Sequence, residues 1–259
     1  MPRRKLGFWL RVAVLILRPP VMVLTKRDWR GAEHLPLGGA VVVVNHISYF
    51  DPLAFAHFIY DGGRSPRFLA KDTLFRIFFV GRVLRGAEQI PVYRLSRDAS
   101  ASFRGAVAAV RRGEIVCVYP EGTVTRDPGL WPMTGKTGAA RIALETGCPV
   151  IPVAQWGAQE LLPPYAKRPH LFPRKTMRLI AGPPVDLSEY QGKEPTGELL
   201  RAATAKIMDT ITGLLEELRG EQAPPERFDM RKHHVPQTGN PAKRGRRPGT
   251  GPGLEVESE

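Results

Sequence analysis

Residues 41–52 read VVVVNHISYFDP, and this stretch predicts the fold of the chain. Four consecutive valines are typical of a strand that is buried on both faces, as in a parallel sheet covered by helices. Asp51 followed by Pro52 predicts the start of a helix, with Asp as the N-cap and Pro at the first helical position. A buried strand that leads through a short turn into a helix is the repeating unit of α/β folds.

The same alternation of strand and helix continues along the chain. We expect further strands at residues 67–71, 89–94, 115–119, 150–154 and 177–181, and helices at 73–84, 98–112, 138–145 and 196–219. The connections between these elements are short, which favours layered packing around one core. The expected fold class is therefore α/β, a single layered domain with a central, mostly parallel sheet flanked by helices.

Composition divides the chain into three parts. The 259 residues are 42% hydrophobic and 24% charged, an ordinary balance for a globular protein. Two cysteines are too few for a disulfide scaffold or a structural zinc cluster. We expect a basic, apolar segment at residues 1–30, a folded domain at 31–220 and a disordered tail at 221–259. The tail is assigned because it is rich in Gly, Pro and Arg and has few large apolar side chains.

The first thirty residues hold eight Lys and Arg against one Asp, a large part of the net charge of +13. Their apolar run, residues 8–17, is interrupted by Arg11 and ended by Arg18-Pro19-Pro20, and is shorter than the roughly 20 residues that span a bilayer. We expect an amphipathic helix that anchors the protein on an anionic membrane. The alternative is a helix buried against the domain. The basic residues expected to contact lipid are Arg3, Arg4, Lys5, Lys26, Arg27 and Arg30.

His46 and Asp51 are the first candidates for chemistry. A histidine that follows a buried strand lies where ligands bind in open α/β sheets, and its side chain accepts a proton near neutral pH. A carboxylate five residues later can hold the other ring nitrogen and stabilise the imidazolium. The spacing alone leaves open that Asp51 only caps the helix and that His46 only packs.

Three further blocks lie at or near strand ends: YPEGT at 119–123, IPVYR at 90–94 and VIPVA at 150–154. The first offers a carboxylate, a permissive glycine and a hydroxyl, but Pro-Glu-Gly is also a common turn. Each block is weak evidence by itself.

Taken together, the blocks resemble the PlsC family of glycerolipid acyltransferases over roughly residues 40–157. Residues 45–51 match its first motif, N-H-x-S-x-x-D, which makes His46 and Asp51 the catalytic dyad. The segment that begins at Lys71 resembles the family's K-x-x-L segment, and residues 86–94 resemble a second motif that ends in a substrate-binding arginine, here Arg94. Residues 120–123 and 150–154 match the third and fourth motifs.

The resemblance also implies a set of substrate-binding residues, which are Lys71, Arg94, Glu121, Gly122, Thr123 and Arg126. The third motif departs from the family pattern E-G-T-R-S, because Val124 and Thr125 intervene before Arg126. Either Arg126 reaches the acceptor's phosphate from its displaced position, or Lys136 takes its place.

The function that the resemblance implies is a 1-acyl-sn-glycerol-3-phosphate acyltransferase of phospholipid biosynthesis. Such an enzyme would sit on the cytoplasmic face of the cell membrane as a peripheral or monotopic protein. It would move an acyl group from acyl-CoA or acyl-carrier protein to the free hydroxyl of lysophosphatidic acid, with no metal and no cofactor. Another lyso-lipid or a lipid-linked sugar is the alternative acceptor.

A basic nucleic-acid or membrane-binding module is the alternative outside the enzyme class. The excess charge adjoins an apolar segment and forms no basic-aromatic stripe, which argues against nucleic acid. A binding module would also have no need of His46 and Asp51.

Overall fold

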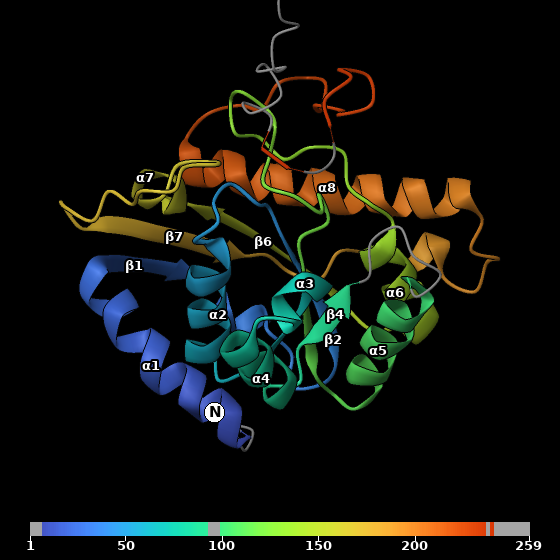
Figure 1. Ribbon diagram of the computed structural model, residues 1–259. Coiled ribbons are helices and arrows are strands. Elements are labelled where there is room, and N and C mark those ends of the chain that lie inside the picture. Colours follow the sequence, from blue (N-terminus) through green and yellow to red (C-terminus); the bar gives the residue numbers. More distant parts are fainter. Residues whose placement is uncertain (1–6, 93–98, 237–238, 241–259) are drawn as a thin grey trace, which may run out of the picture.

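The computed structural model describes residues 7–92, 99–236 and 239–240. Its centre is a seven-stranded sheet in the order β1-β7-β6-β2-β5-β3-β4 (Figure 1). The strands are β1 (Thr25–Arg30), β2 (Ala40–Val44), β3 (Pro66–Lys71), β4 (Ile90–Val92), β5 (Ile115–Val118), β6 (Val150–Trp156) and β7 (Lys175–Ala181).

Most of the sheet is parallel, as expected. Strands β6, β2, β5, β3 and β4 all run in one direction, whereas β7 pairs antiparallel to β6 and carries β1 parallel to itself. The carboxyl ends of the five parallel strands therefore meet at one edge of the sheet. Ligand sites of open α/β sheets lie at this edge.

Helices cover both faces of the sheet. They are α1 (Phe8–Leu24), α2 (Asp51–Asp61), α3 (Asp72–Phe75), α4 (Phe78–Gly86), α5 (Ala99–Arg111), α6 (Gly138–Thr146), α7 (Ala158–Leu161) and α8 (Gly197–Arg219), with short 3₁₀ turns at η1 (Ala32–His34) and η2 (Ser188–Tyr190). Strand β2 shows why: Val41 and Val43 pack into a core with α5, α6 and α8, and Val42 and Val44 pack into a core with α2. All four valines are fully buried. Strand β2 lies at the centre of the sheet, between β6 and β5.

The N-terminal segment differs from the expectation in two ways. Residues 25–30, expected to belong to the anchor, form β1 and extend the sheet through β7. The helix expected to end at Arg18-Pro19-Pro20 continues to Leu24. Proline fits helical φ, but inside a helix it removes a backbone hydrogen bond and its ring crowds the preceding turn. Side-chain contacts at this point hold α1 to its neighbours. Arg18 on α1 and Arg27 on β1 both pair with Asp61 on α2, at 3.0 and 3.2 Å.

None of the helices in the described ranges combines the length and the apolar character needed to cross a bilayer.

The helix expected at residues 73–84 is two helices, α3 and α4, with a break at Arg76 and Ile77. At the break the backbone folds back on itself: a Cβ on Gly81 would lie 2.1 Å from the carbonyl oxygen of Phe75. The Arg85 guanidinium donates to the same carbonyl at 2.6 Å. Apolar periodicity missed the break because every residue from 77 to 80 is apolar.

The prediction of a disordered tail from residue 221 is wrong for the first part of that segment. The Phe228 carbonyl accepts a hydrogen bond from the Thr134 amide at 3.0 Å, Arg227 pairs with Asp209 on α8 at 2.6 Å, and Met230 is buried. Residues 221–236 therefore pack on the domain. The remaining part, apart from residues 239–240, lies outside the described residues.

The pairing of β1 with β7 can be tested at Gly31, directly after β1. Gly31 has φ +72°, and a Cβ there would lie 1.9 Å from the carbonyl oxygen of Ala181 in β7. Gly31→Ala should lower the free energy of unfolding by more than about 2 kcal/mol, through backbone strain and steric overlap. Urea unfolding measures this. Gly38→Ala is the control, since a Cβ there meets no atom within 4 Å; equal losses in both variants would contradict the docking of β1.

Candidate active site

His46 follows β2 and is held by its backbone between two loops. Its amide donates to Oε1 of Glu121 at 2.8 Å, and its carbonyl accepts from the Thr125 amide at 2.7 Å. Glu121 and Thr125 both lie in the loop after β5, the strand beside β2. The backbone of His46 is therefore held by the loop after the neighbouring strand, independently of the contacts of its side chain.

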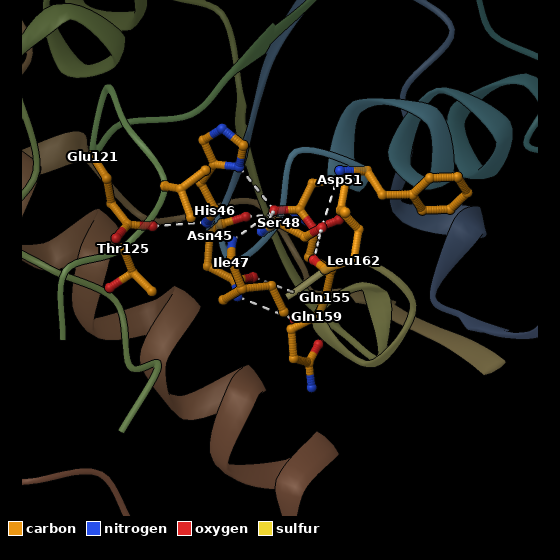
Figure 2. Close-up of polar contacts among 12 residues, drawn as sticks. Asn45, His46, Ile47, Ser48, Asp51, Glu121, Thr125, Gln155, Gln159 and Leu162 are labelled. Carbon is orange, nitrogen blue, oxygen red and sulfur yellow. Dashed lines mark hydrogen bonds and ion pairs between the residues drawn. The ribbon is translucent and has the colours of Figure 1, made fainter. Parts of the chain in front are cut away.

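The Asp51 carboxylate organises the turn between β2 and α2. Its Oδ2 accepts hydrogen bonds from Nδ1 of His46 at 2.8 Å, from the Ile47 amide at 2.6 Å and from the Ser48 amide at 2.8 Å (Figure 2). The expectation that Asp51 is the N-cap was wrong, because Phe50 holds that position and Asp51 is the first helical residue. Its side chain consequently reaches back to the loop and not forward to the amides of its own helix.

This contact fixes the protonation pattern of the imidazole. Because the carboxylate oxygen accepts, Nδ1 of His46 carries the hydrogen and Nε2 keeps its lone pair for an incoming proton. Asp51 is fully buried, and this burial raises its pKa against the opposing hydrogen bonds from His46 and the two amides. The His46 side chain is 14% exposed, so solvent or substrate can reach it. The structure thus brings together the two residues predicted to form the dyad.

The His46 ring stacks on Tyr119, the first residue after β5, with centroids 4.2 Å apart and an interplanar angle of 29°. The pKa of the Tyr119 phenol is raised well above its ordinary value, by burial first and by the Asp51 charge in addition. Tyr119 is therefore a neutral wall of the site. The sequence placed it in a motif block but gave no sign of the stacking.

Asn45 and Gln155 join the carboxyl ends of β2 and β6 through three hydrogen bonds. Nδ2 of Asn45 donates to the Gln155 carbonyl at 3.1 Å, the Gln155 amide donates to Oδ1 of Asn45 at 2.8 Å, and Nε2 of Gln155 donates to the Asn45 carbonyl at 2.6 Å. Sequence reasoning missed this pair. The available signal was a polar side chain at the end of each of two buried strands.

Glu121 occupies a different place from the one expected of a substrate-binding residue. It is fully buried, and its second oxygen accepts from the Met133 amide at 3.1 Å. Burial raises the pKa of Glu121 to about 8. Both carboxyl oxygens are used on backbone amides. Glu121 is a positioning residue for the His46 backbone.

Gly122 and Thr123 form the surface of the same loop and are both half-buried. Gly122 has φ +71°, which favours glycine, and its amide donates to the Tyr119 carbonyl at 3.0 Å. A Cβ on Gly122 would lie 3.0 Å from Nζ of Lys136. The Lys136 side chain therefore lies over this turn.

Arg126 is buried near the same loop, despite its displacement in the motif. Its guanidinium lies over the ring of Tyr165, 4.7 Å from the centroid, and Nη2 donates to the Gly239 carbonyl at 2.7 Å. Nε and Nη1 are buried and have no hydrogen-bond partner within the described ranges. The preceding residue, Thr125, bonds directly to His46.

Lys71 is exposed at the carboxyl end of β3, on the same edge of the sheet as His46. Arg94 lies outside the described residues. Across the part of the chain that the structure describes, no three His, Cys, Asp or Glu side chains are grouped as metal ligands.

The chain is similar to known proteins over most of its length. Residues 26–156 match the family described as Acyltransferase. The 1-acyl-sn-glycerol-3-phosphate acyltransferase of Borreliella burgdorferi is 32% identical over 186 residues, which cover 70% of this chain and 71% of that protein. The enzyme of the same name from Bacillus subtilis is 28% identical over 206 residues, covering 79% and 93%.

A crystal structure of the 1-acyl-sn-glycerophosphate (LPA) acyltransferase PlsC from Thermotoga maritima is similar in fold. It superposes with a TM-score of 0.60 at 25% sequence identity, and the match covers 83% of this chain and 81% of that one. The similarity confirms the expected α/β architecture.

The buried carboxyl of Glu121 predicts a pH dependence of stability. Its pKa rises from 4.5 to about 8 on folding, so between these values the folded protein holds a proton that the unfolded chain has released. The stability contributed by this group is therefore present at low pH and is lost as the pH rises through about 8, by up to about 1.4 kcal/mol per pH unit.

Glu121→Gln should remove this component of the pH dependence and lower stability at acidic pH, because an amide nitrogen cannot accept from a backbone amide. Urea unfolding from pH 5 to pH 9 measures the difference between wild type and variant. Glu160→Gln, at an exposed position, should leave the pH profile unchanged. A wild-type profile that persists in Glu121→Gln would show that this carboxyl does not titrate on unfolding.

Proposed function

The chain belongs to the acyltransferase family, and we propose that it transfers an acyl group from acyl-CoA or acyl-carrier protein to the free hydroxyl of lysophosphatidic acid, forming phosphatidic acid. The observation that carries the proposal is the 2.8 Å contact between His46 and Asp51 at the carboxyl end of β2. The names of the relatives from Borreliella and Bacillus support this choice of acceptor.

The reaction follows from the orientation of the imidazole. Nε2 of His46 takes the proton of the acceptor hydroxyl as its oxygen attacks the thioester carbonyl carbon. The tetrahedral intermediate collapses, the carbon–sulfur bond breaks, and the leaving thiolate takes the proton from the imidazolium. The buried Asp51 carboxylate stabilises this imidazolium while it exists. Acyl transfer is direct, so neither cysteine needs to act as a nucleophile.

Cationic side chains at the same edge of the sheet favour an acceptor with a phosphate group. Arg126 places two guanidinium nitrogens that have no hydrogen-bond partner among the described residues near the loop that bonds to His46. Lys71 ends β3 at this edge, and the Lys136 side chain lies over the Gly122 turn. A guanidinium donates charge-assisted hydrogen bonds to a phosphate, which orients the acceptor as well as attracting it. Gly122 and Thr123 would shape the surface between the phosphate and His46, and Arg94 is kept as a fourth candidate.

We propose that the enzyme works on the cytoplasmic face of the membrane as a peripheral protein. The acceptor's acyl chain stays in the bilayer while its headgroup must reach His46. The apolar side chains that α1 exposes support this arrangement.

A panel of acceptors tests the function. Purified protein with an acyl-CoA and, separately, an acyl-carrier protein should acylate lysophosphatidic acid faster than lysophosphatidylcholine or a lipid-linked sugar. Product identification by mass spectrometry is the measurement. Faster turnover of an acceptor that carries no phosphate monoester would transfer the proposal to the alternative acceptor class.

The dyad predicts the effect of two substitutions. His46→Ala should lower kcat by about 10²- to 10⁴-fold, the usual contribution of a general base. Asp51→Asn should also be severely impaired, because an amide neither fixes the Nδ1–H tautomer nor stabilises the imidazolium. Both rates are measured on dispersed acceptor, with thermal unfolding as a check on folding. His170→Ala, at an exposed histidine, is the control; His46→Ala at close to the wild-type rate would overturn the mechanism.

The phosphate site predicts a separate effect on binding. Arg126→Gln should raise KM for lysophosphatidic acid by about tenfold or more, since charge-assisted hydrogen bonds to a buried guanidinium are strong. The value of kcat should change much less, because the guanidinium does not touch the reacting atoms. Arg168→Gln, at an exposed arginine, should leave both constants unchanged. An unchanged KM in a folded Arg126→Gln would assign the phosphate to Lys71, Lys136 or Arg94 instead.

A further inference from the structure

Two segments far apart in the sequence expose large apolar side chains. On α1, Leu15 is 75% exposed and Phe8 is 70% exposed. On α3, α4 and the break between them, Phe78 is 84% exposed and Phe79 is 60% exposed. The other exposed apolar residues of these segments are Ile16, Leu17, Met22, Val23, Leu74, Ile77 and Val80. Monomeric soluble proteins rarely leave so many large apolar groups together in water.

The two segments lie side by side. Figure 1 shows α4 next to the N-terminal half of α1. Their approach is close: a Cβ on Gly86 would lie 2.1 Å from the Trp9 ring, and the Arg82 guanidinium lies over that ring, 5.7 Å from its centroid. Residues 8–24 and 72–86 together are called the α1–α4 surface below.

The charges of the α1–α4 surface are almost all positive. Residues 8–24 contain no acidic residue, and Arg11 is exposed among their apolar side chains. Residues 72–86 contain one acidic residue, Asp72, which pairs with Arg76 at 3.1 Å, while Arg82 and Arg85 remain exposed. Exposed aromatic and aliphatic side chains with arginines between them complement a leaflet of anionic lipids.

The α1–α4 surface also reaches the edge of the sheet that holds His46. Helix α3 begins directly after Lys71, the last residue of β3, and Phe68 in β3 stacks on Tyr119, the residue that stacks on His46. A bilayer bound to this surface would therefore lie next to the edge of the sheet that holds His46. The geometry points to a single lipid-docking surface made by α1, α3 and α4, which binds an anionic bilayer.

This surface differs from an anchor made by the first thirty residues alone. Lys26, Arg27 and Arg30 lie on β1, an edge strand of the sheet, where Arg27 pairs with Asp61 at 3.2 Å and Arg30 with Asp28 at 3.4 Å. The apolar contribution is shared between α1 and α4, and within the described residues the charge comes from Arg11, Arg82 and Arg85. Arg3, Arg4 and Lys5 lie outside the described residues. A second copy of the chain is a poorer occupant, because a twofold contact would oppose like charges.

Vesicle co-sedimentation with the full chain tests the proposal without any acyl donor. Wild type should bind vesicles of equal parts phosphatidylglycerol and phosphatidylcholine, and more weakly vesicles of phosphatidylcholine alone. Phe78→Ser with Phe79→Ser should weaken binding to both by about tenfold or more, since two exposed aromatic side chains no longer enter the leaflet. Leu37→Ser is the matched control: Leu37 is 63% exposed but precedes β2, at the opposite edge of the sheet.

The charge component is tested by Arg11→Gln with Arg82→Gln, which should reduce the preference for anionic vesicles and the sensitivity to salt. Unchanged binding in the Phe78 and Phe79 double variant would overturn the proposal. The proposal would also be overturned if light scattering showed that the double variant loses a dimer that wild type forms while its vesicle binding stays unchanged, because the surface would then hold a second copy.

The inference rests on the proposed function only because a lipid acceptor gives the enzyme a reason to bind a bilayer. Acylation of dispersed acceptor by a double variant that no longer binds vesicles would support both proposals, whereas wild type that binds vesicles but acylates no acceptor would refute the function alone.

Discussion

One carboxylate oxygen organises the site and the start of the helix that follows it. Oδ2 of Asp51 accepts from the His46 ring and from the amides of Ile47 and Ser48. The same oxygen therefore shapes the turn after β2 and orients the imidazole held by that turn. Because Asp51 is fully buried, water does not compete for these hydrogen bonds, and each is stronger than it would be at the surface.

The remaining contacts hold this unit to its neighbours on both sides. Asn45 and Gln155 join β2 to β6, and Glu121 joins the His46 amide to the loop after β5. The strands supply these residues in adjacent positions because β6, β2 and β5 are parallel and end at one edge. The imidazole is thus oriented before substrate arrives, which is the condition for efficient general-base catalysis.

The sequence predicted well those features that depend on local pattern. The strand at Val41–Val44 and the helix near Asp51 follow from the apolar run and from the Asp-Pro pair. The pairing of His46 with Asp51 was left open by the spacing and was implied by the resemblance to the family's first motif. What it missed depends on distant partners. The strand at residues 25–30 carries three basic side chains and becomes a strand only through β7. The role of Glu121 depends on burial against Met133 and His46, and residues 221–236 are ordered by α8 and the loop around Thr134. Neither the periodicity of apolar residues nor the composition of a segment indicates such distant partners.

Helix α2 connects the candidate active site to the N-terminal segment. Its first residue, Asp51, holds His46, and its last residue, Asp61, holds Arg18 of α1 and Arg27 of β1. The helix has eleven residues and so is about 16 Å long. A helix of fixed length between the proposed membrane contact and the proton acceptor would hold His46 at a set distance from the bilayer. It would sort lipids by how far their reactive hydroxyl projects above the hydrocarbon, a criterion independent of headgroup charge.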